Sequence, residues 1–401
     1  MSAAYPGTGM VRKWVILGQV NLHDEGREWQ DIYKREVWWH RRAWLGGVAL
    51  AAGIAILVIS HQMVAGGGDL PTATYPPPSQ NAPATMQPGV GEAGTCTISV
   101  TEYGASTRAA DNSGAFQAAI LAGEGGTVCI PAGTWKVTSQ LVIPAAETLT
   151  GAGASNTTLL QTVSDHNLLQ VRGAGTAVEA LTLDTQTYDG GIAFSTGASH
   201  VTLRNAQVRS GNQPGHFAIY FAGPRGATVA APHYSIGNTL ENVIVSDQIC
   251  DDGVSWSFQT GGVINNVHET GSRLALYVDD GTTVDGYQYT PGPCAAMDDG
   301  YWITPPSQSI TLDGFVSSGS AGKICPNISK GRSCTNITVE AEQAPRGTLQ
   351  IGDVTGLKVR GTTVQRVRVS TATGATGTWA SSNPATARCD GRPVAIIGLS
   401  C

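Results

Sequence analysis

Short apolar runs recur at near-regular intervals along most of the chain, and this repeat limits the possible fold more than any other feature. Eight runs lie 20 to 37 residues apart and are centred on Val178, Leu203, Leu240, Ile264, Val284, Leu312, Ile337 and Val359. In six of them the residue two positions later is Asn or Gly, the types that adopt a positive φ at least steric cost. Strand, left-handed turn and strand, repeated at this period, predict the rungs of a parallel β-solenoid.

The turn residues have a second use in such a stack. They are Asn205, Asn242, Asn266, Gly286, Gly314 and Gly361. Because the rungs lie directly on one another, we expect the three asparagine amides to hydrogen-bond to each other along the stack. The longest interval contains a Gly/Pro/Ala-rich stretch, 222–237, which we interpret as one inserted surface loop.

The composition agrees with many short strands and excludes one class of partner. The chain has 401 residues, 51 of them glycine, and only 13% are charged. A net charge of −6 argues against non-specific binding to nucleic acid. All eight cysteines follow residue 95, which predicts disulfides in an oxidising compartment. From their closeness in sequence we expect the pairs Cys325–Cys334 and Cys389–Cys401.

The first 95 residues predict three segments before the repeat. Residues 1–43 are polar and rich in Lys and Arg, residues 44–65 are apolar and uncharged, and residues 66–95 are rich in Pro and Gly. About twenty apolar residues span a bilayer as a helix, and the basic flank places the N-terminus in the cytoplasm. We therefore expect a single-pass cell-membrane protein with a linker at 66–95 and an extracytoplasmic domain at 96–401. The alternative is secretion after cleavage, because Arg41-Arg42 resembles a twin-arginine export signal.

The start of the solenoid needs a cap over its exposed strand edges. Residues 98–100 predict a short strand, and residues 113–122 predict a helix with Asp111, Asn112 or Ser113 as its N-cap. We expect this helix to be the cap.

Three motifs flank or follow the expected helix: VTEYGA at 100–105, GGTVCIPAGTW at 125–135 and LTGAG at 149–153. Together with the helix, they resemble the N-terminal signature of the β-helix proteins related to pectate lyases and family-28 glycosidases. This resemblance implies an all-β domain, a right-handed single-stranded parallel β-helix, with a polysaccharide as the usual ligand. It leaves the reaction open, because one scaffold hosts several chemistries.

Aligned rungs predict a column of ionisable side chains on the outer surface. Asp189, His216, Asp251 and Arg273 each lie three residues before a residue that we expect to point inward, namely Ile192, Ile219, Val254 and Leu276. Asp252 adds a third carboxylate beside this column. Tyr220 and Tyr277 alternate with the inward residues, so they face outward and offer flat surfaces for sugar rings.

Most glycoside hydrolases use a pair of carboxylates as their catalytic groups. Asp189 and Asp251, two rungs apart, would be separated by roughly 9–10 Å, near the range of about 6.5–9.5 Å for inverting glycosidases. In the glycosidases that the chain resembles, an Asp-Asp pair opens this same strand, and Asp251-Asp252 match it. We therefore expect a hydrolase that acts on an acidic polysaccharide without a cofactor, with Asp189, Asp251 and Asp252 as carboxylates and His216 and Arg273 as partners.

Two alternatives stay open. A lyase or epimerase would neutralise a uronate carboxylate with Arg273 or with Ca²⁺ held by the same aspartates. Asp279-Asp280 and Asp298-Asp299 are further acidic pairs, which we interpret as turns. A non-catalytic carbohydrate-binding or adhesion protein is favoured by the position of His216 before the Asp pair, and by Thr107-Arg108 where the resembling proteins carry an acidic stretch.

Overall fold

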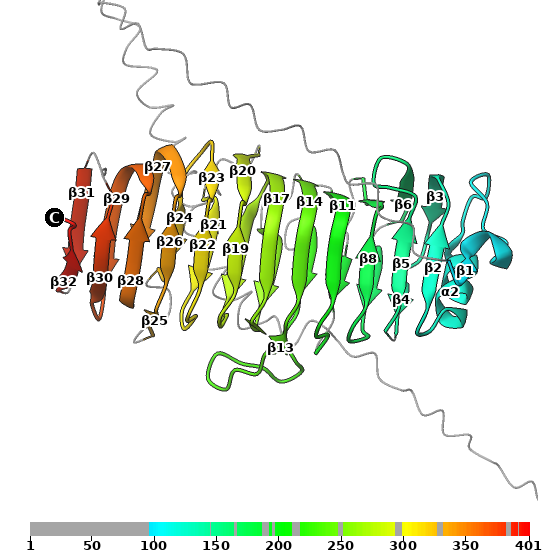
Figure 1. Cartoon of the computed structure of the whole chain (residues 1–401), viewed down its shortest axis with the longest axis horizontal. Helices are drawn as coiled ribbons and strands as arrows, with labels where there is room; N and C mark the ends of the chain where they lie inside the picture. Colours follow the sequence, from blue (N-terminus) through cyan, green and yellow to red (C-terminus); the bar gives the residue numbers. More distant parts are fainter. Residues whose placement is uncertain are drawn as a thin grey trace, which may run out of the picture. The chain divides into compact units, whose positions relative to one another are not determined.

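Strands dominate the computed structural model, which describes residues 96–401 apart from 145, 164–166, 187–191, 195–196, 211–216, 248–251, 293–298, 327–331, 382–385 and 392. The segments expected at 1–43, 44–65 and 66–95 lie outside the described residues. Among those described, no helix is long and apolar enough to cross a membrane. The predicted parallel β-solenoid is confirmed: the described strands pair in parallel from one rung to the next (Figure 1).

Three elongated sheets form the sides of the solenoid, and each rung between the two terminal ones, meaning one turn of the chain, contributes to all three. Sheet A consists of β1 (Ile98–Ser99), β2 (Thr127–Ile130), β5 (Thr148–Gly151), β8 (Ala177–Glu179), the first halves of β11 (Thr202–Ser210), β14 (Thr239–Asp247) and β17 (Val263–Gly271), and then β19 (Thr283–Asp285), β22 (Thr311–Asp313), β26 (Thr338–Glu340), β28 (Val354–Arg360), β30 (Ala375–Ala380) and β32 (Val394–Ile397).

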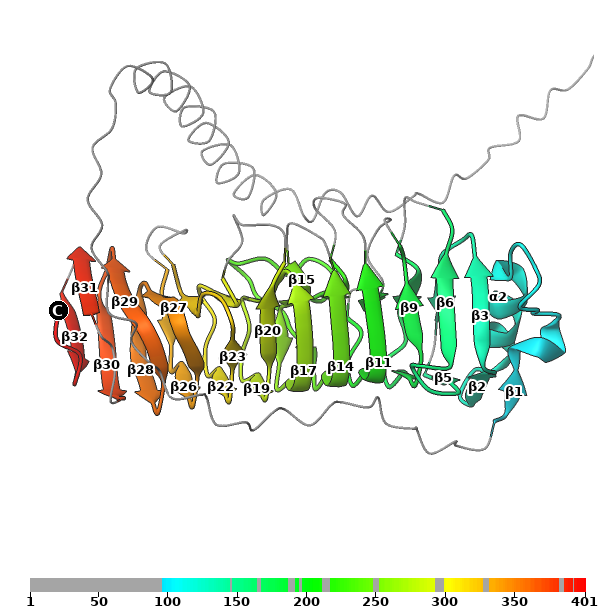
Figure 2. The ribbon, with the colours of Figure 1, turned by 90° about the horizontal axis from the view of Figure 1, so that it is seen from above.

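Sheet B consists of β3 (Gly133–Val137), β6 (Thr157–Gln161), β9 (Thr182–Asp184), the second halves of β11, β14 and β17, then β20 (Gln288–Pro291), β23 (Val316–Ser317) and the first parts of β27 (Gln343–Ile351) and β29 (Thr363–Thr371). Figure 2 shows β11, β14 and β17 side by side as arrows of one direction.

Sheet C contains the strands of the predicted site. It consists of β4 (Leu141–Ile143), β7 (Leu169–Val171), β10 (Ile192–Phe194), β12 (Ile219–Phe221), β15 (Asp252–Ser257), β18 (Arg273–Tyr277), β21 (Tyr301–Thr304), β24 (Gly322–Ile324), the ends of β27 and β29, and β31 (Thr386–Gly391). β25 (Cys334–Thr335) pairs with the start of β28.

Apolar columns fill the interior between the sheets. In sheet A the predicted central residues Val178, Leu203, Leu240 and Ile264 lie in register on neighbouring strands and are fully buried. Each column continues through the rungs because alternate strand residues point inward at the same height. The solenoid therefore has one continuous core along its length.

The left-handed turns between sheets A and B form a complete ladder. Positive φ values of 50–64° occur one rung after another at Ala180, Asn205, Asn242, Asn266, Gly286, Gly314, Ala341 and Gly361. The expected amide ladder is confirmed, since Asn266 Nδ2 donates to Asn242 Oδ1 at 2.7 Å and Asn242 Nδ2 donates to Asn205 Oδ1 at 3.2 Å.

One central residue of the repeat was predicted wrongly. Leu312 lies beside Val339 and not beside Ile337. The turn of this rung falls on Ala341, which adopts φ 52° without being Asn or Gly. No Asn or Gly therefore marks the turn of this rung, and Ile337 was predicted as its central residue in place of Val339, two positions later.

A short helix closes the N-terminal end of the solenoid. α2 (Ser113–Ala122) has the predicted bounds, and its buried Phe116, Ala119 and Ile120 join the core (Figure 1). Asn112 is the N-cap residue, while Asp111 accepts hydrogen bonds from the backbone N–H and the hydroxyl of Ser113.

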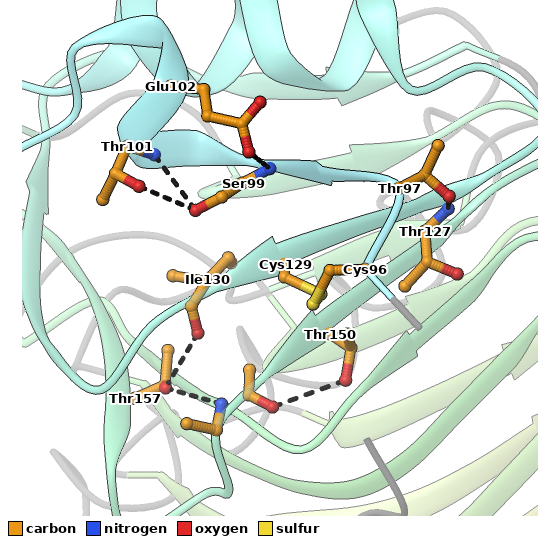
Figure 3. The surroundings of a disulfide bond; sticks show 12 residues. Cys96, Thr97, Ser99, Thr101, Glu102, Thr127, Cys129, Ile130, Thr150 and Thr157 are labelled. Carbon is orange, nitrogen blue, oxygen red and sulfur yellow. Dashed lines mark hydrogen bonds between the residues drawn. A yellow bond between two sulfur atoms is a disulfide. The ribbon is translucent and has the colours of Figure 1, made fainter. Parts of the chain in front are cut away.

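Disulfides and a short 3₁₀ helix fix the first rung. Cys96–Cys129 joins a residue two positions before β1 to β2, as Figure 3 shows. The following 3₁₀ helix, η1 (Val100–Tyr103), replaces the end of the strand predicted at 98–100 and begins with a capping box of Ser99 and Glu102. The predicted disulfides Cys325–Cys334 and Cys389–Cys401 are both confirmed.

The stretch 222–237 is an insertion between β12 and β14, as predicted. It ends in β13 (Ser235–Ile236), which pairs with β16 (Gln259–Thr260) in a separate two-stranded sheet, and Figure 1 shows the loop projecting from the solenoid.

Candidate functional site

A β-bulge in sheet C creates the local geometry of the candidate site. β15 and β18 pair Asp252 with Arg273 and then Val254 with Leu274, so Gly253 has no partner. A bulge changes the alternation of side chains by one residue. Asp252 is thereby brought to the outward face beside Arg273, although Val254 two residues later points into the core.

Because of the bulge, the predicted alignment of β18 with β15 is wrong by two residues. Ile192, Ile219 and Val254 are in register as expected, but Leu274 and not Leu276 lies beside Val254. Leu276 points inward as predicted, next to Trp256. Arg273 is consequently a neighbour of Asp252, which the predicted alignment had placed one position away from the column.

Asp252 is fully buried and both of its carboxylate oxygens are engaged. Arg273 Nε donates to Oδ1 at 2.7 Å, and the hydroxyl of Tyr277 donates to Oδ2 at 2.5 Å. Charge-assisted bonds of this kind hold a carboxylate in one orientation. Three of the predicted site residues thus meet in one cluster.

The indole of Trp302 covers the guanidinium of Arg273. The guanidinium carbon lies 4.1 Å from the centre of the ring, and the ring of Tyr277 packs edge-on at 6.1 Å. Trp302 is on β21, on the outward face of the next rung, between core residues Tyr301 and Ile303. Cation–π stacking of this kind is strongest when water is excluded, and Arg273 is only 3% exposed.

A second ion pair completes the cluster. Asp299 Oδ2 lies 2.7 Å from Lys323 Nζ and 4.0 Å from Arg273 Nη1. Arg273 therefore lies between two carboxylates, those of Asp252 and Asp299. Burial alone would lower the pKa of Arg273, but Asp252, Tyr277 and Asp299 outweigh it, so its pKa lies above the ordinary value. The guanidinium is permanently charged.

Two buried donors in this cluster have no acceptor among the residues that the structure describes: Nη2 of Arg273 and Nε1 of Trp302. An unpaired buried N–H costs about 1–3 kcal/mol, more when it is charged. Both donors belong to residues that are in direct contact with each other.

The other predicted site residues are placed as follows. Tyr220 faces outward on β12, in register with Ser255, and its ring packs on Phe217 at 5.0 Å. Its rung comes before that of Asp252. Asp189, His216 and Asp251 lie outside the described residues.

Three members of the cluster were missed by the sequence reasoning. Asp299 had been interpreted as part of a turn, and Trp302 and Lys323 had not been selected. The signal was present in the order of the rungs, since Trp302 pairs with Ala275 and Lys323 pairs with Trp302. Asp279, the other acidic pair's first residue, is fully buried, and its burial raises its pKa well above the usual range.

Within the described part of the chain, no three His, Cys, Asp or Glu side chains are arranged to hold a metal ion. The cluster pairs its acids with bases, whereas a hard cation requires several free oxygen ligands.

Comparison with known proteins agrees with the signature in the N-terminal rungs. The family model described as "Rhamnogalacturonase A/epimerase, pectate lyase-like" matches residues 97–300. A search of curated proteins finds no significant match.

Several solved structures match over much of the chain at low sequence identity. ORF18 of Geobacillus virus E2 is 17% identical, with 73% of this chain and 61% of that chain covered and a TM-score of 0.38. The A-module of the mannuronan C-5 epimerase AlgE4 of Azotobacter vinelandii is 15% identical, with coverages of 76% and 98% and a TM-score of 0.42. An alginate lyase of Paenibacillus sp. is 16% identical, with coverages of 61% and 97% and a TM-score of 0.44.

The matched residues 97–300 make up more than half of the chain and include the cap helix, the disulfide-linked first rung, the strand pair β15–β18 and Asp299. The chain is thus a member of the rhamnogalacturonase A/epimerase, pectate lyase-like family of β-helix proteins.

Proposed function

We propose that this protein binds a polysaccharide across the outward face of sheet C and hydrolyses it at the cluster of Asp252, Arg273 and Trp302. The observation that carries the proposal is the pair of unpaired buried donors, Arg273 Nη2 and Trp302 Nε1. Sugar hydroxyls and uronate carboxylates supply the acceptors that such donors need. Trp302 and Tyr277 supply the aromatic surface on which sugar rings pack.

Asp252 holds the site in place in this proposal and does not itself act as the acid. Both of its oxygens are already engaged by Arg273 and Tyr277, which fixes the orientation of the carboxylate. Asp251, the preceding residue, is the proposed general acid. Asp189 is the proposed second carboxylate and His216 its partner, in a right-handed β-helix that brings their rungs together.

Elimination or epimerisation is the second candidate, and one contact favours it. The hydroxyl of Tyr277 and the guanidinium of Arg273 converge on the same carboxylate. A cation that neutralises a uronate carboxylate, next to a hydroxyl that can exchange a proton, is the arrangement required to remove the proton beside that carboxylate.

The nature of the product decides between these candidates. The full-length chain is incubated with a panel of acidic and neutral polysaccharides, and three signals are followed: new reducing ends, ultraviolet absorbance of unsaturated sugars, and sugar configuration by NMR. New reducing ends without unsaturation support hydrolysis. Unsaturation supports elimination, and a changed configuration in an intact polymer supports epimerisation. Binding without any product contradicts the enzyme proposal and leaves a carbohydrate-binding protein.

We also propose that the solenoid is displayed outside the cell on a membrane anchor at 44–65. The three disulfides among the described residues, Cys96–Cys129, Cys325–Cys334 and Cys389–Cys401, support an oxidising compartment. Protease added to intact cells should then release a disulfide-containing fragment of residues 96–401, while carbonate washing should leave the full chain in the membrane fraction. Release of the full chain by carbonate would contradict the anchor.

A further inference from the structure

A buried tyrosine directly behind the candidate site crosses the interior of the solenoid. Tyr301 precedes Trp302 on β21 and points into the core, whereas Trp302 points outward over the guanidinium of Arg273. The hydroxyl of Tyr301 lies 3.5 Å from Oε2 of Glu342. Glu342 follows β26, which lies two rungs further along the stack than β19 and β21. The side chain of Tyr301 therefore joins a strand of the candidate site to a corner between sheets A and B.

A glycine and a phenylalanine hold the ring of Tyr301 in place. Gly322 is in register with Tyr301 on the next rung, and a Cβ at Gly322 would lie 2.5 Å from atoms of the ring. Phe315 packs edge-on against the same ring at 4.9 Å. Gly322 directly precedes Lys323, so the ring lies against the backbone beside two outward residues of the cluster, Trp302 and Lys323. Close-packed interiors transmit small displacements, so a shift of the ring also moves these two residues.

The carboxyl at the far end of the ring has few partners. Glu342 is fully buried, and its Oε1 has no hydrogen-bond partner among the residues that the structure describes. Phe315 in the rung before and Thr362 in the rung after occupy the same corner, and neither can carry a charge. Burial raises the pKa of Glu342 to about 8, so the carboxyl is uncharged at neutral pH.

The nearest other ionisable groups in this part of the core are paired with each other. Tyr287 lies one rung before Phe315 and stacks on its ring at 5.5 Å, with 8° between the planes. The hydroxyl of Tyr287 donates a hydrogen bond to Oε2 of Glu269. The ring of Phe315 therefore separates this pair from Glu342, which keeps Tyr301 as its ionisable neighbour.

Loss of the proton from Glu342 would place a charge where the described residues supply one donor, the hydroxyl of Tyr301. A buried charge persists only when it is paired or hydrated. The hydroxyl must then move closer to the carboxylate, or water must enter beside the ring. Either change displaces the ring of Tyr301 from its position over Gly322.

We propose that Tyr301 and Glu342 are positioning residues, which hold Trp302 over Arg273 while Glu342 is protonated and release this contact when the proton leaves. The proposal rests on the proposed function only because Trp302 belongs to the site that is assigned there. It adds a control of that site from inside the core.

Fluorine NMR of the full-length chain labelled with 5-fluorotryptophan tests this coupling without a substrate. The signal of Trp302 is identified by its absence from Trp302→Phe. From about pH 6 to about pH 9.5 we expect this signal to shift with a midpoint near 8, as the pKa of Glu342 requires. Glu342→Gln keeps the shape of the side chain and should abolish the shift. Glu340→Gln is the matched control on the outward face of sheet A and should keep it.

Tyr301→Phe keeps the ring and removes the hydroxyl, so it should also abolish the shift of the Trp302 signal. No shift in the natural chain, or an equal shift in the natural chain and either Glu342→Gln or Tyr301→Phe, overturns the proposal.

A kinetic measurement then connects the coupling to the site. Because Trp302 is proposed to bind the sugar, KM on a cleaved polysaccharide should rise above pH 8 in the natural chain and stay constant in Glu342→Gln. An equal rise of KM in both chains contradicts the role in positioning. The NMR signal is read without any substrate, so failure of this coupling can be told from failure of the proposed hydrolysis.

Discussion

Arg273 and Asp252 form a buried ion pair in which Nε and Oδ1 lie 2.7 Å apart, and their side chains are 3% and 0% exposed. The residues belong to successive rungs and are neighbours only because Gly253 bulges out of the strand pairing. The pair therefore links the fold of sheet C to the candidate site.

Removing one partner of this pair should destabilise the protein strongly. Asp252→Ala leaves the Arg273 guanidinium buried without its main counter-charge, and Asp299 at 4.0 Å is too distant to replace it. We expect a loss of about 3–5 kcal/mol in the free energy of unfolding, measured by urea denaturation. Asp390→Ala in the exposed pair with Arg388 is the control and should cost less than about 1 kcal/mol. Similar losses in both variants would show that the buried pair has no special role.

The left-handed ladder predicts that removing a methyl group from one turn and adding one to the turn of the next rung change the stability of the protein in opposite directions. Ala341 adopts φ 52° and Gly361 adopts φ 60°. Ala341→Gly should stabilise the protein by about 1 kcal/mol, and Gly361→Ala should destabilise it by about the same amount. A Cβ at Gly361 would meet Ala341 atoms only at 3.8 Å or more, so the cost is one of backbone conformation.

Thermal unfolding of both variants beside the natural chain measures these effects. A destabilising Ala341→Gly would mean that the entropy of the unfolded chain outweighs the relief of the left-handed strain, and would contradict the prediction.

A buried carboxyl in the core predicts a dependence of stability on pH. Glu342 is fully buried, and burial raises its pKa to about 8, while the hydroxyl of Tyr301 at 3.5 Å offsets part of this effect. In the unfolded chain the group returns to its ordinary value of 4.5. The folded state thus binds the extra proton, and stability should fall as pH rises from about 4.5 to about 8, by up to about 4 kcal/mol.

Glu342→Gln removes this titration while keeping the shape of the side chain. We expect its advantage over the natural chain to grow between pH 5 and pH 8, as measured by urea unfolding at both values. Glu340→Gln, two residues earlier and outward on sheet A, is the control and should show no comparable change. A constant difference across this pH range would contradict the buried neutral carboxyl.

The fold could be predicted largely from sequence because most rungs repeat the same pattern, an apolar strand residue followed two positions later by a residue that tolerates positive φ. Asn205, Asn242 and Gly286 mark the turns through their tolerance of positive φ, and the apolar residues two positions earlier then fall in register. Prediction failed where another residue accepts the strain, as Ala341 does. No local pattern distinguishes that alanine from an ordinary one.

The site was less predictable because it depends on register to a single residue. The bulge at Gly253 moves Leu274 beside Val254, and an Asp-Asp-Gly sequence does not reveal whether it bulges or turns. Asp299 was interpreted as a turn residue because its partner, Lys323, is distant in sequence. Lys323 lies on the next rung, and the number of residues from one rung to the next varies along the chain. Arg273 was found as a member of the predicted column, Asp252 as a carboxylate beside that column, and Tyr277 as an outward residue that alternates with the core.

The catalytic role proposed for Asp251 is tested most directly by the kcat/KM of Asp251→Asn on the polysaccharide that the natural chain cleaves. Asp285→Asn, the same change on the outward face of sheet A, serves as the control. The proposed general acid predicts a loss of about 10²–10⁴-fold for Asp251→Asn with unchanged unfolding, and full activity for Asp285→Asn. Equal kcat/KM in the natural chain and Asp251→Asn would contradict it.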